Sequence, residues 1–255
     1  MEPHRTALLA ALIGVALTQA CSDSGDIAAP DPTPTPVAVV QLNGDVATQL
    51  PAFAASIGDI NNGVEPGFHP SGRRQINWDG VPAQFTNTLD FPVDFFKVRG
   101  LVYGGTTGLR VSDNNFADIN PTYAAEFAAL STPKLFAPIG TSEVEVLFRI
   151  PASDTVAAVR SFGAVVVDVD RPNASRLLAY DKDNRLLADI AVPVRAAGSP
   201  FSLVGVSFAD PIITRVVLTL GEVPLGAQVN DVSGGGAGDV VVLDDFAYSE
   251  PQRLE

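Results

Sequence analysis

The stretch Asp239-Val-Val-Val-Leu-Asp-Asp-Phe-Ala-Tyr248 decides which fold class the sequence predicts. An apolar run of this length, which follows the glycine-rich segment 234–238, is typical of a strand buried in a sheet. Neighbouring strand residues point to opposite faces, so this pattern places at most one of Asp244 and Asp245 toward the core. A carboxylate in that position needs a cation or a hydrogen-bond donor.

Other segments show the same strand pattern. In residues 143–150 the apolar Val144, Val146, Phe148 and Ile150 alternate with a second set that includes three charged side chains, which predicts a half-buried strand. Further strands are expected at residues 100–103, 109–112, 134–139, 163–169, 176–180, 186–192, 203–208 and 213–220.

Turns separate these strands at short intervals, and helices are few. Asp181-Lys-Asp-Asn184 has the composition of a hairpin turn between two strands. Only residues 51–57 and 121–130 have the composition of short helices. We therefore expect an all-β fold, an antiparallel β-sandwich or jelly roll with one or two short helices.

Composition excludes several classes of function. The formal net charge of -13 over 255 residues argues against nucleic-acid binding, because a phosphate backbone requires clustered Lys and Arg. With one cysteine and two histidines, of which only His69 follows the N-terminal segment, a zinc site built on His and Cys is excluded. The chain also has no Gly-x-Ser-x-Gly motif of a serine hydrolase.

The N-terminus has the pattern of an export signal. Arg5 precedes the uninterrupted apolar residues 7–17, and the single cysteine, Cys21, follows shortly afterwards. This arrangement is similar to a bacterial lipoprotein signal, in which the cysteine becomes the lipidated first residue after cleavage. Cleavage after Ala20 without lipidation is the alternative, because Thr18 departs from the usual lipoprotein pattern.

These observations divide the chain into three parts. Residues 1–20 are the expected signal peptide, and residues 21–36 form a tether of the lipoprotein type, with Pro and Thr alternating in an extended spacer. Residues 37–255 are expected to form the β-sandwich domain. The predicted location is the bacterial cell envelope or outer surface, with the membrane reached through the lipid.

Acidic loops of the domain suit calcium, which binds six to eight oxygen atoms, many of them from irregular segments. Residues 59–65 and 113–118 are rich in Asp and Asn, although neither has the spacing of an EF-hand. Their side chains can instead form Asx-turns with their own backbone. The ligands predicted for one structural calcium ion are Asp79, Asp244, Asp245 and Asn62.

Trp78 is the only tryptophan and has two interpretations. An exposed indole beside Arg73 or Arg74 could stack on a sugar ring, which makes these three residues the candidate ligand-binding set. A tryptophan that anchors the core of a sandwich is the alternative, and the sequence favours it. In the absence of calcium, one of the two arginines is the expected partner of the inward-facing acid.

Three segments carry a resemblance to a known group of proteins. Gly72-Arg-Arg-Gln-Ile-Asn-Trp-Asp-Gly80, Phe162-Gly-Ala-Val-Val-Val-Asp-Val-Asp170 and Val241-Val-Leu-Asp-Asp-Phe246 resemble a group of uncharacterised secreted bacterial β-rich proteins, some of which carry PEP-CTERM sorting tails. The closing Asp-Asp-Phe strand is also similar to that of galactose-binding-like jelly rolls, in which a structural calcium often joins the chain ends. The resemblance implies an exported β-rich fold and no activity.

The sequence thus favours a non-enzymatic module that is exported, lipid-anchored and either ligand-binding or structural. Carbohydrate or another cell-surface component is the expected ligand. An extracellular carboxylate-dependent hydrolase of the glycoside type is one alternative, since the domain is rich in acids. A purely structural envelope protein is the other.

Membrane attachment through Cys21 leads to a direct prediction. Cells grown with a fatty-acid analogue should label the wild-type protein and not a Cys21→Ser variant, because only the cysteine sulfur receives the lipid. Several buried acyl chains would hold the protein stably on a membrane. Equal labelling of the two proteins would contradict the lipoprotein interpretation.

Overall fold

A computed structural model describes Met1 and residues 32–104 and 108–254. The chain divides into two units, Met1–Pro32 and Thr33–Glu255, and all described helices and strands belong to the second. Residues 2–31, which include Cys21 and all of the expected signal peptide except Met1, lie outside the described residues. Among the described residues, no helix is both long and apolar enough to cross a membrane.

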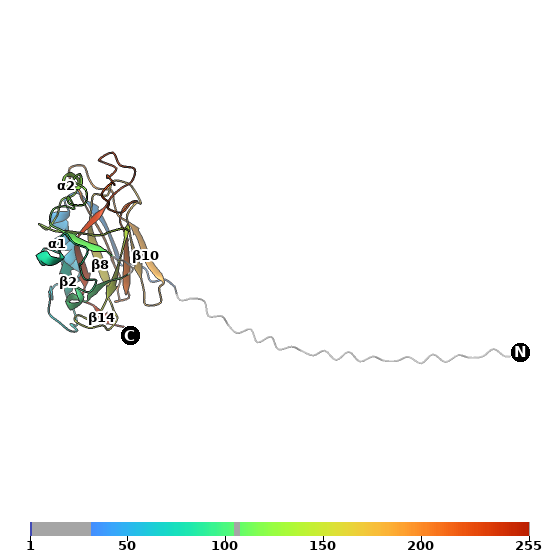
Figure 1. Cartoon of the computed structure of the whole chain (residues 1–255). Helices are drawn as coiled ribbons and strands as arrows, with labels where there is room; N and C mark the ends of the chain where they lie inside the picture. The colour runs from blue at the N-terminus through green and yellow to red at the C-terminus, as the bar shows by residue number, and fades with distance from the viewer. Residues whose placement is uncertain (2–31, 105–107, 255) are drawn as a thin grey trace. The chain divides into compact units, whose positions relative to one another are not determined.

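The folded unit consists mainly of two antiparallel β-sheets (Figure 1). Sheet A has the order β1 (Ala38–Asn43), β11 (Phe201–Ser207), β8 (Ser161–Val167), β13 (Val242–Ser249), β5 (Leu135–Pro138) and β4 (Leu109–Ser112), and β2 (Arg73–Ile76) also pairs with β13. Sheet B has the order β10 (Leu186–Ala191), β9 (Arg176–Tyr180), β12 (Arg215–Thr219), β6 (Glu143–Phe148) and β3 (Leu101–Gly104). The expected all-β sandwich is confirmed.

Short elements complete the fold. Strands β7 (Ala157–Ala158) and β14 (Gln252–Arg253) form a separate pair. The helices are α1 (Val46–Ile57), the single turn α2 (Tyr123–Glu126), and the 3₁₀ segments η1 (Ala83–Phe85) and η2 (Lys97–Arg99).

The main core lies between the two sheets. The alternating residues Val144, Val146 and Phe148 of β6 are fully buried there, as the sequence predicts. From sheet A, Phe162 and Phe246 pack against them, with ring centroids 6.0 Å apart for Phe148 and Phe162 and 5.2 Å apart for Phe162 and Phe246. Both sheets therefore contribute one apolar face to a shared interior.

The opposite face of sheet A is covered by α1. The Asp45 side chain caps this helix by accepting a hydrogen bond from the Thr48 backbone nitrogen. The Phe53 ring packs over Gly163 of β8 and Gly205 of β11, which are paired across the two strands. A Cβ atom would lie 2.3 Å from the ring at Gly163 and 2.9 Å from it at Gly205, so only glycine leaves room for this contact.

An ion pair ties the end of β13 to β2. Arg74 donates from Nε and Nη2 to the two carboxylate oxygens of Glu250, at 2.8 and 2.7 Å, and both side chains are buried. Its remaining nitrogen, Nη1, donates to the backbone carbonyls of Gly63 and Glu65. Removing one partner of such a buried pair typically destabilises a fold by about 3–5 kcal/mol.

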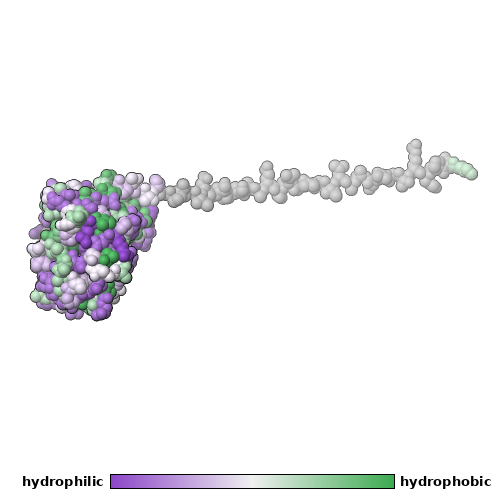
Figure 2. Space-filling model, turned by 90° about the horizontal axis from the view of Figure 1, so that it is seen from above, coloured by the Kyte–Doolittle hydropathy of each residue, from purple (hydrophilic) through white to green (hydrophobic). Residues whose placement is uncertain are grey.

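The surface of the folded unit carries both hydrophilic and hydrophobic residues. Figure 2 shows hydrophilic and hydrophobic residues interspersed on the face in view. Exposed apolar side chains such as Val39, Ile60 and Leu89 lie far apart in the sequence. Exposed apolar side chains are normal on a protein surface.

Candidate functional site

Asp244 and Asp245 lie at a β-bulge in β13. Leu243 pairs with Val166 and Phe246 pairs with Ala164, so the two acids together lie opposite the single residue Val165. The Ser131 hydroxyl oxygen is 3.2 Å from Oδ1 of Asp244 and 2.8 Å from Oδ1 of Asp245. Both carboxyl groups are therefore on the same side, and the expectation that they face opposite ways is wrong because the bulge interrupts the alternation.

The two carboxyl groups form a coupled pair, hereafter the dyad. Burial raises the pKa of Asp244 to about 8, and the adjacent charge of Asp245 contributes to this shift. Burial also raises the pKa of Asp245, against hydrogen bonds from Ser131 and Asp244 that lower it. Both shifts have the same direction, so burial and the proximity of the two groups favour a protonated form of the dyad, whose carboxyl groups titrate as a coupled pair.

A cleft of about 320 Å³ lies beside Asp245, hereafter the α1 cleft. Its two walls differ in character. One is apolar and comes from α1, and the other is polar and comes from β2, β13 and the segment before β5. The lining residues are Ala47, Leu50, Pro51, Ala54, Arg73, Gln75, Leu130, Ser131 and Asp245.

Arg73 and Gln75 are held in place at the polar wall. Nη1 of Arg73 donates to the backbone carbonyls of Gly58 and Asp59, while its buried Nε has no hydrogen-bond partner among the described residues. Oε1 of Gln75 accepts a hydrogen bond of 3.0 Å from the Asn61 amide. The cleft lining therefore combines the guanidinium group of Arg73 with the carboxyl group of Asp245.

Two of the three predicted sugar-binding residues are buried elsewhere. Trp78 is only 1% exposed, stacks on Phe136 at 4.8 Å between centroids and meets Phe246 edge-on at 4.9 Å. Its role as a sugar platform is therefore wrong, and the core interpretation is confirmed. Arg74 is fully buried in its pair with Glu250, so it binds neither a ligand nor the dyad. Arg73 alone lines a cleft.

The four predicted calcium ligands do not converge. Asp79 lies close enough to Asp245 for its charge to raise that pKa, and its Oδ1 accepts a hydrogen bond from the Lys134 backbone. Asn62, however, donates a hydrogen bond to Glu250. Glu250 follows Asp245 by five residues, which in an extended chain separates the two by about 16 Å. The prediction that one calcium ion binds Asp79, Asp244, Asp245 and Asn62 is therefore wrong. The oxygen atoms of Asp244 and Asp245 also have other partners, namely Leu130, Ser131 and each other.

A second group of acids was missed by sequence reasoning. Glu126, Asp168, Asp170, Asp231 and Asp239 form two overlapping triads that share Asp231, and they are hereafter the acidic cluster. Within each triad the ligand oxygens all lie within 4.8 Å of one another. This cluster, rather than the dyad, contains the groups that could hold a metal ion in the described part of the chain.

Burial dominates the electrostatics of the acidic cluster. It raises the pKa of Asp168 to about 8, although Arg195 opposes the shift, and it raises the pKa of Asp239 to about 6 against hydrogen bonds from the backbone of Asp170 and Arg171. The neighbouring charge of Asp231 raises both values further. These carboxyl groups repel one another wherever they are ionised together.

The antiparallel pairing of β8 and β13 explains why the acidic cluster forms. Val167 at the end of β8 pairs with Val242 at the start of β13, so Asp168 and Asp239 are brought to the same edge of sheet A. The signal in the sequence was an acid just outside each of two long apolar runs. It becomes informative only once those two runs are known to be neighbours.

Two solved structures show a weak similarity to this chain. No protein-family model and no curated protein sequence matches the chain. A glycoside hydrolase family 43 arabinoxylan arabinofuranohydrolase from Bacillus subtilis, in complex with cellotetraose, aligns over 60% of this chain and 26% of its own, with a TM-score of 0.30 and 12% identity. The enzymatically active domain of tailspike protein 4 from bacteriophage CBA120 aligns over 68% of this chain and 22% of its own, with a TM-score of 0.25 and 10% identity.

The chain spans about a quarter of the length of these two solved structures. Likeness at this level carries no argument about either site. The chemistry of the α1 cleft and of the acidic cluster is therefore inferred from the geometry of this chain alone.

Asp244 should make the stability of the protein depend on pH. Its pKa rises from an ordinary 3.8 to about 8 on folding, so folding favours the protonated form. That contribution is fully present below about pH 4 and is lost as the pH rises toward 8. An Asp244→Asn variant imitates the protonated acid, and we expect its unfolding midpoint to fall less than that of the wild type between pH 5 and pH 8.

Thermal unfolding across this pH range would measure the difference. Asp210→Asn, at an exposed position, is the matched control and should follow the wild type. Parallel curves for wild type and Asp244→Asn would contradict a protonated Asp244.

Proposed function

We propose that this chain is an exported, lipid-anchored β-sandwich module that binds a saccharide in the α1 cleft. The observation that carries the proposal is the pairing, in one cleft, of the apolar α1 wall with a wall of fixed polar groups. Asp245 supplies a carboxyl group, Arg73 a guanidinium group, and Ser131 a hydroxyl to the lining of the cleft. A cleft of about 320 Å³ is at the lower end of the usual range for small-molecule sites.

The chemistry of a sugar suits these two walls. A saccharide presents hydroxyl groups around its rim, each both donor and acceptor, and carbon–hydrogen groups on its faces. Charged partners such as Arg73 and Asp245 make hydrogen bonds to such groups about twice as strong as neutral ones. The methyl and methylene groups of Ala47, Leu50 and Ala54 would cover the apolar surface of the ligand.

The export half of the proposal comes from the sequence. The apolar residues 7–17 after Arg5, followed by the lone Cys21 and a Pro-Thr tether, are what supports it. A domain held on such a tether would meet ligands of the cell surface or of the medium. The net charge of -13 supports an uncharged or cationic ligand over a polyanionic one.

Binding is favoured over glycoside hydrolysis by the geometry of the dyad. A glycosidase places its two carboxyl groups about 5–5.5 Å apart to retain stereochemistry, or about 6.5–9.5 Å apart to invert it. Asp244 and Asp245 instead share a hydrogen bond, and Asp244 is fully buried, with the Leu130 backbone and Ser131 as further partners. Only Asp245 lines the cleft, so a second carboxyl group for acid–base work is lacking there.

A binding screen tests the proposal. Isothermal titration calorimetry of the purified protein against neutral, basic and acidic oligosaccharides should find at least one ligand. Asp245→Asn should then weaken binding by about tenfold or more, because a hydrogen bond to a charged group contributes roughly 1.5–3 kcal/mol. Gln75→Ala should also weaken binding, by a smaller factor.

The exposed Asp210→Asn variant is the control and should bind as the wild type does. Failure of every oligosaccharide to bind, or equal affinity in Asp245→Asn, would contradict a saccharide site in the α1 cleft. Release of reducing ends from a bound oligosaccharide, abolished by Asp245→Asn, would favour the hydrolase instead.

A further inference from the structure

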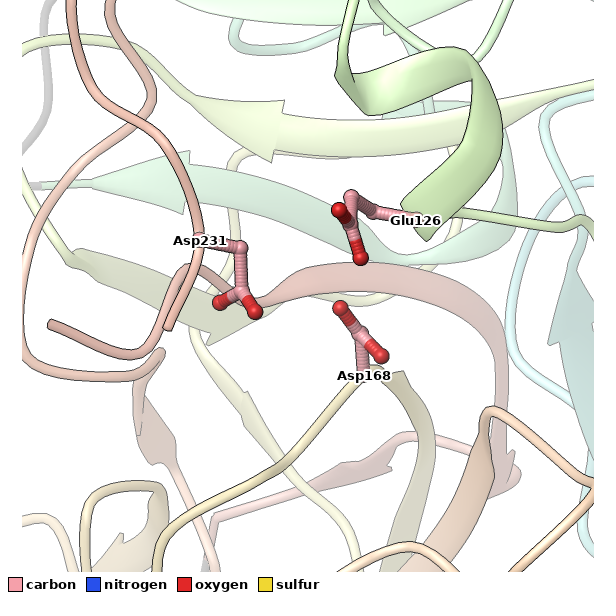
Figure 3. A group of neighbouring side chains, drawn as sticks. All are labelled: Glu126, Asp168 and Asp231. Atoms are coloured by element: carbon pink, nitrogen blue, oxygen red, sulfur yellow. The ribbon is translucent and has the colours of Figure 1, made fainter. Parts of the chain in front are cut away.

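The acidic cluster brings together three separate parts of the chain. Glu126 ends α2, Asp168 follows β8, and Asp231 lies in the long segment between β12 and β13. Figure 3 shows the carboxyl groups of these three residues pointing toward one another. Residues so far apart in sequence meet here only because the fold places all three elements at one edge of sheet A.

The negative charge of the acidic cluster is only partly balanced by the chain. Among the described residues, its five carboxyl groups make ion pairs with one guanidinium group, that of Arg195, which pairs with Asp168 and Asp170. Asp168, Asp231 and Asp239 are at most 1% exposed, so water provides little compensation. Buried charge of this kind is unfavourable unless a cation or a proton neutralises it.

Two buried oxygen atoms in the acidic cluster have no hydrogen-bond partner. They are Oδ2 of Asp168 and Oδ1 of Asp239. The other oxygen of each group is engaged, by Arg195 for Asp168 and by the backbone nitrogens of Asp170 and Arg171 for Asp239. Buried polar atoms are nearly always paired in folded proteins, so an unpartnered carboxylate oxygen in each of the two triads points to a bound ion.

The spacing of the oxygens fits one ion. Calcium binds oxygen at about 2.3–2.6 Å, so two ligand oxygens on opposite sides of a calcium ion lie about 5 Å apart at most. The ligand oxygens of Glu126, Asp168 and Asp231 lie within 4.8 Å of one another, which meets that requirement.

The segment that carries Asp231 holds this side chain firmly. Oδ1 of Asp231 accepts a hydrogen bond from the Val240 backbone at 2.8 Å, and Oδ2 accepts one from the Ser233 backbone at 2.6 Å. The Gly236 backbone donates to the Asp231 carbonyl, and a Cβ atom at Gly236 would lie 1.7 Å from the Asn230 carbonyl oxygen. Each Asp231 oxygen keeps a second lone pair, which a metal ion can use.

We propose that the acidic cluster is a calcium site, with Glu126, Asp168 and Asp231 as its carboxylate ligands and Asp239 beside Asp231 adding negative charge. The ligand atoms that these three side chains offer are carboxylate oxygens, which suit calcium and magnesium and not the softer transition metals. Calcium tolerates the irregular geometry of ligands drawn from loops, whereas magnesium requires a near-ideal octahedron. The ion would tie the β12–β13 segment to α2 and to the end of β8.

Calorimetry on the full chain tests this site directly. After removal of metal with a chelator, titration with calcium chloride should show binding, and millimolar calcium should raise the melting temperature by several degrees. Asp168→Asn and Glu126→Gln each remove one ligand charge with little change in shape. Each should weaken calcium binding by about tenfold or more and reduce the shift in melting temperature in proportion.

Asp244→Asn is the control for replacing a buried acid by its amide, because Asp244 lies outside the acidic cluster. It should bind calcium as the wild type does. If Asp168→Asn does not fold, the half-exposed Glu126→Gln still decides the question. Absence of calcium binding, equal binding by Glu126→Gln, or an equal response to magnesium would overturn the calcium assignment.

Discussion

The structure depends on how carboxyl groups are accommodated in and around a strand that is removed from water. β13 pairs with β8, β5 and β2, and Asp239, Asp244 and Glu250 along this stretch are at most 2% exposed. Moving an ionised carboxylate out of water is expensive unless it is paired or protonated. Two of the three acids meet this requirement: Glu250 pairs with Arg74, and burial raises the pKa of Asp244 to about 8, which favours its protonated form. Asp239 accepts two backbone hydrogen bonds and keeps one oxygen unpartnered.

The hydrogen-bond and ion-pair partners of these acids also determine which distant segments β13 contacts. Glu250 and Arg74 together hold the loop around Gly63 against the end of the strand. Asp244 binds the segment at Leu130 and Ser131, which forms part of the polar wall of the α1 cleft. Acids along one stretch of chain thus take part in both places: Asp245, at the bulge of β13, lines the α1 cleft, and Asp239, before the start of β13, belongs to the acidic cluster.

The sequence predicted most of the fold because strand periodicity is a local signal. The alternation in β6 and the apolar runs of β8 and β13 were sufficient to place the core, whereas β2 was missed because Arg74 is a buried charge whose partner is 176 residues away. The site was predicted less well. The bulge at Asp244 depends on the register of β13 against β8, and the acidic cluster depends on which strands are neighbours. Neither is encoded in the spacing of residues along one segment.

The central claim is that a buried carboxyl group at the bulge of β13 is kept neutral by its surroundings. Carbon-13 NMR of the aspartate side-chain carboxyl groups, with the Asp244 signal identified by its loss in Asp244→Asn, measures that protonation state directly. The account predicts that the Asp244 signal is that of a protonated acid at pH 7 and changes to that of a carboxylate near pH 8. A transition close to the ordinary value of 3.8 would contradict it.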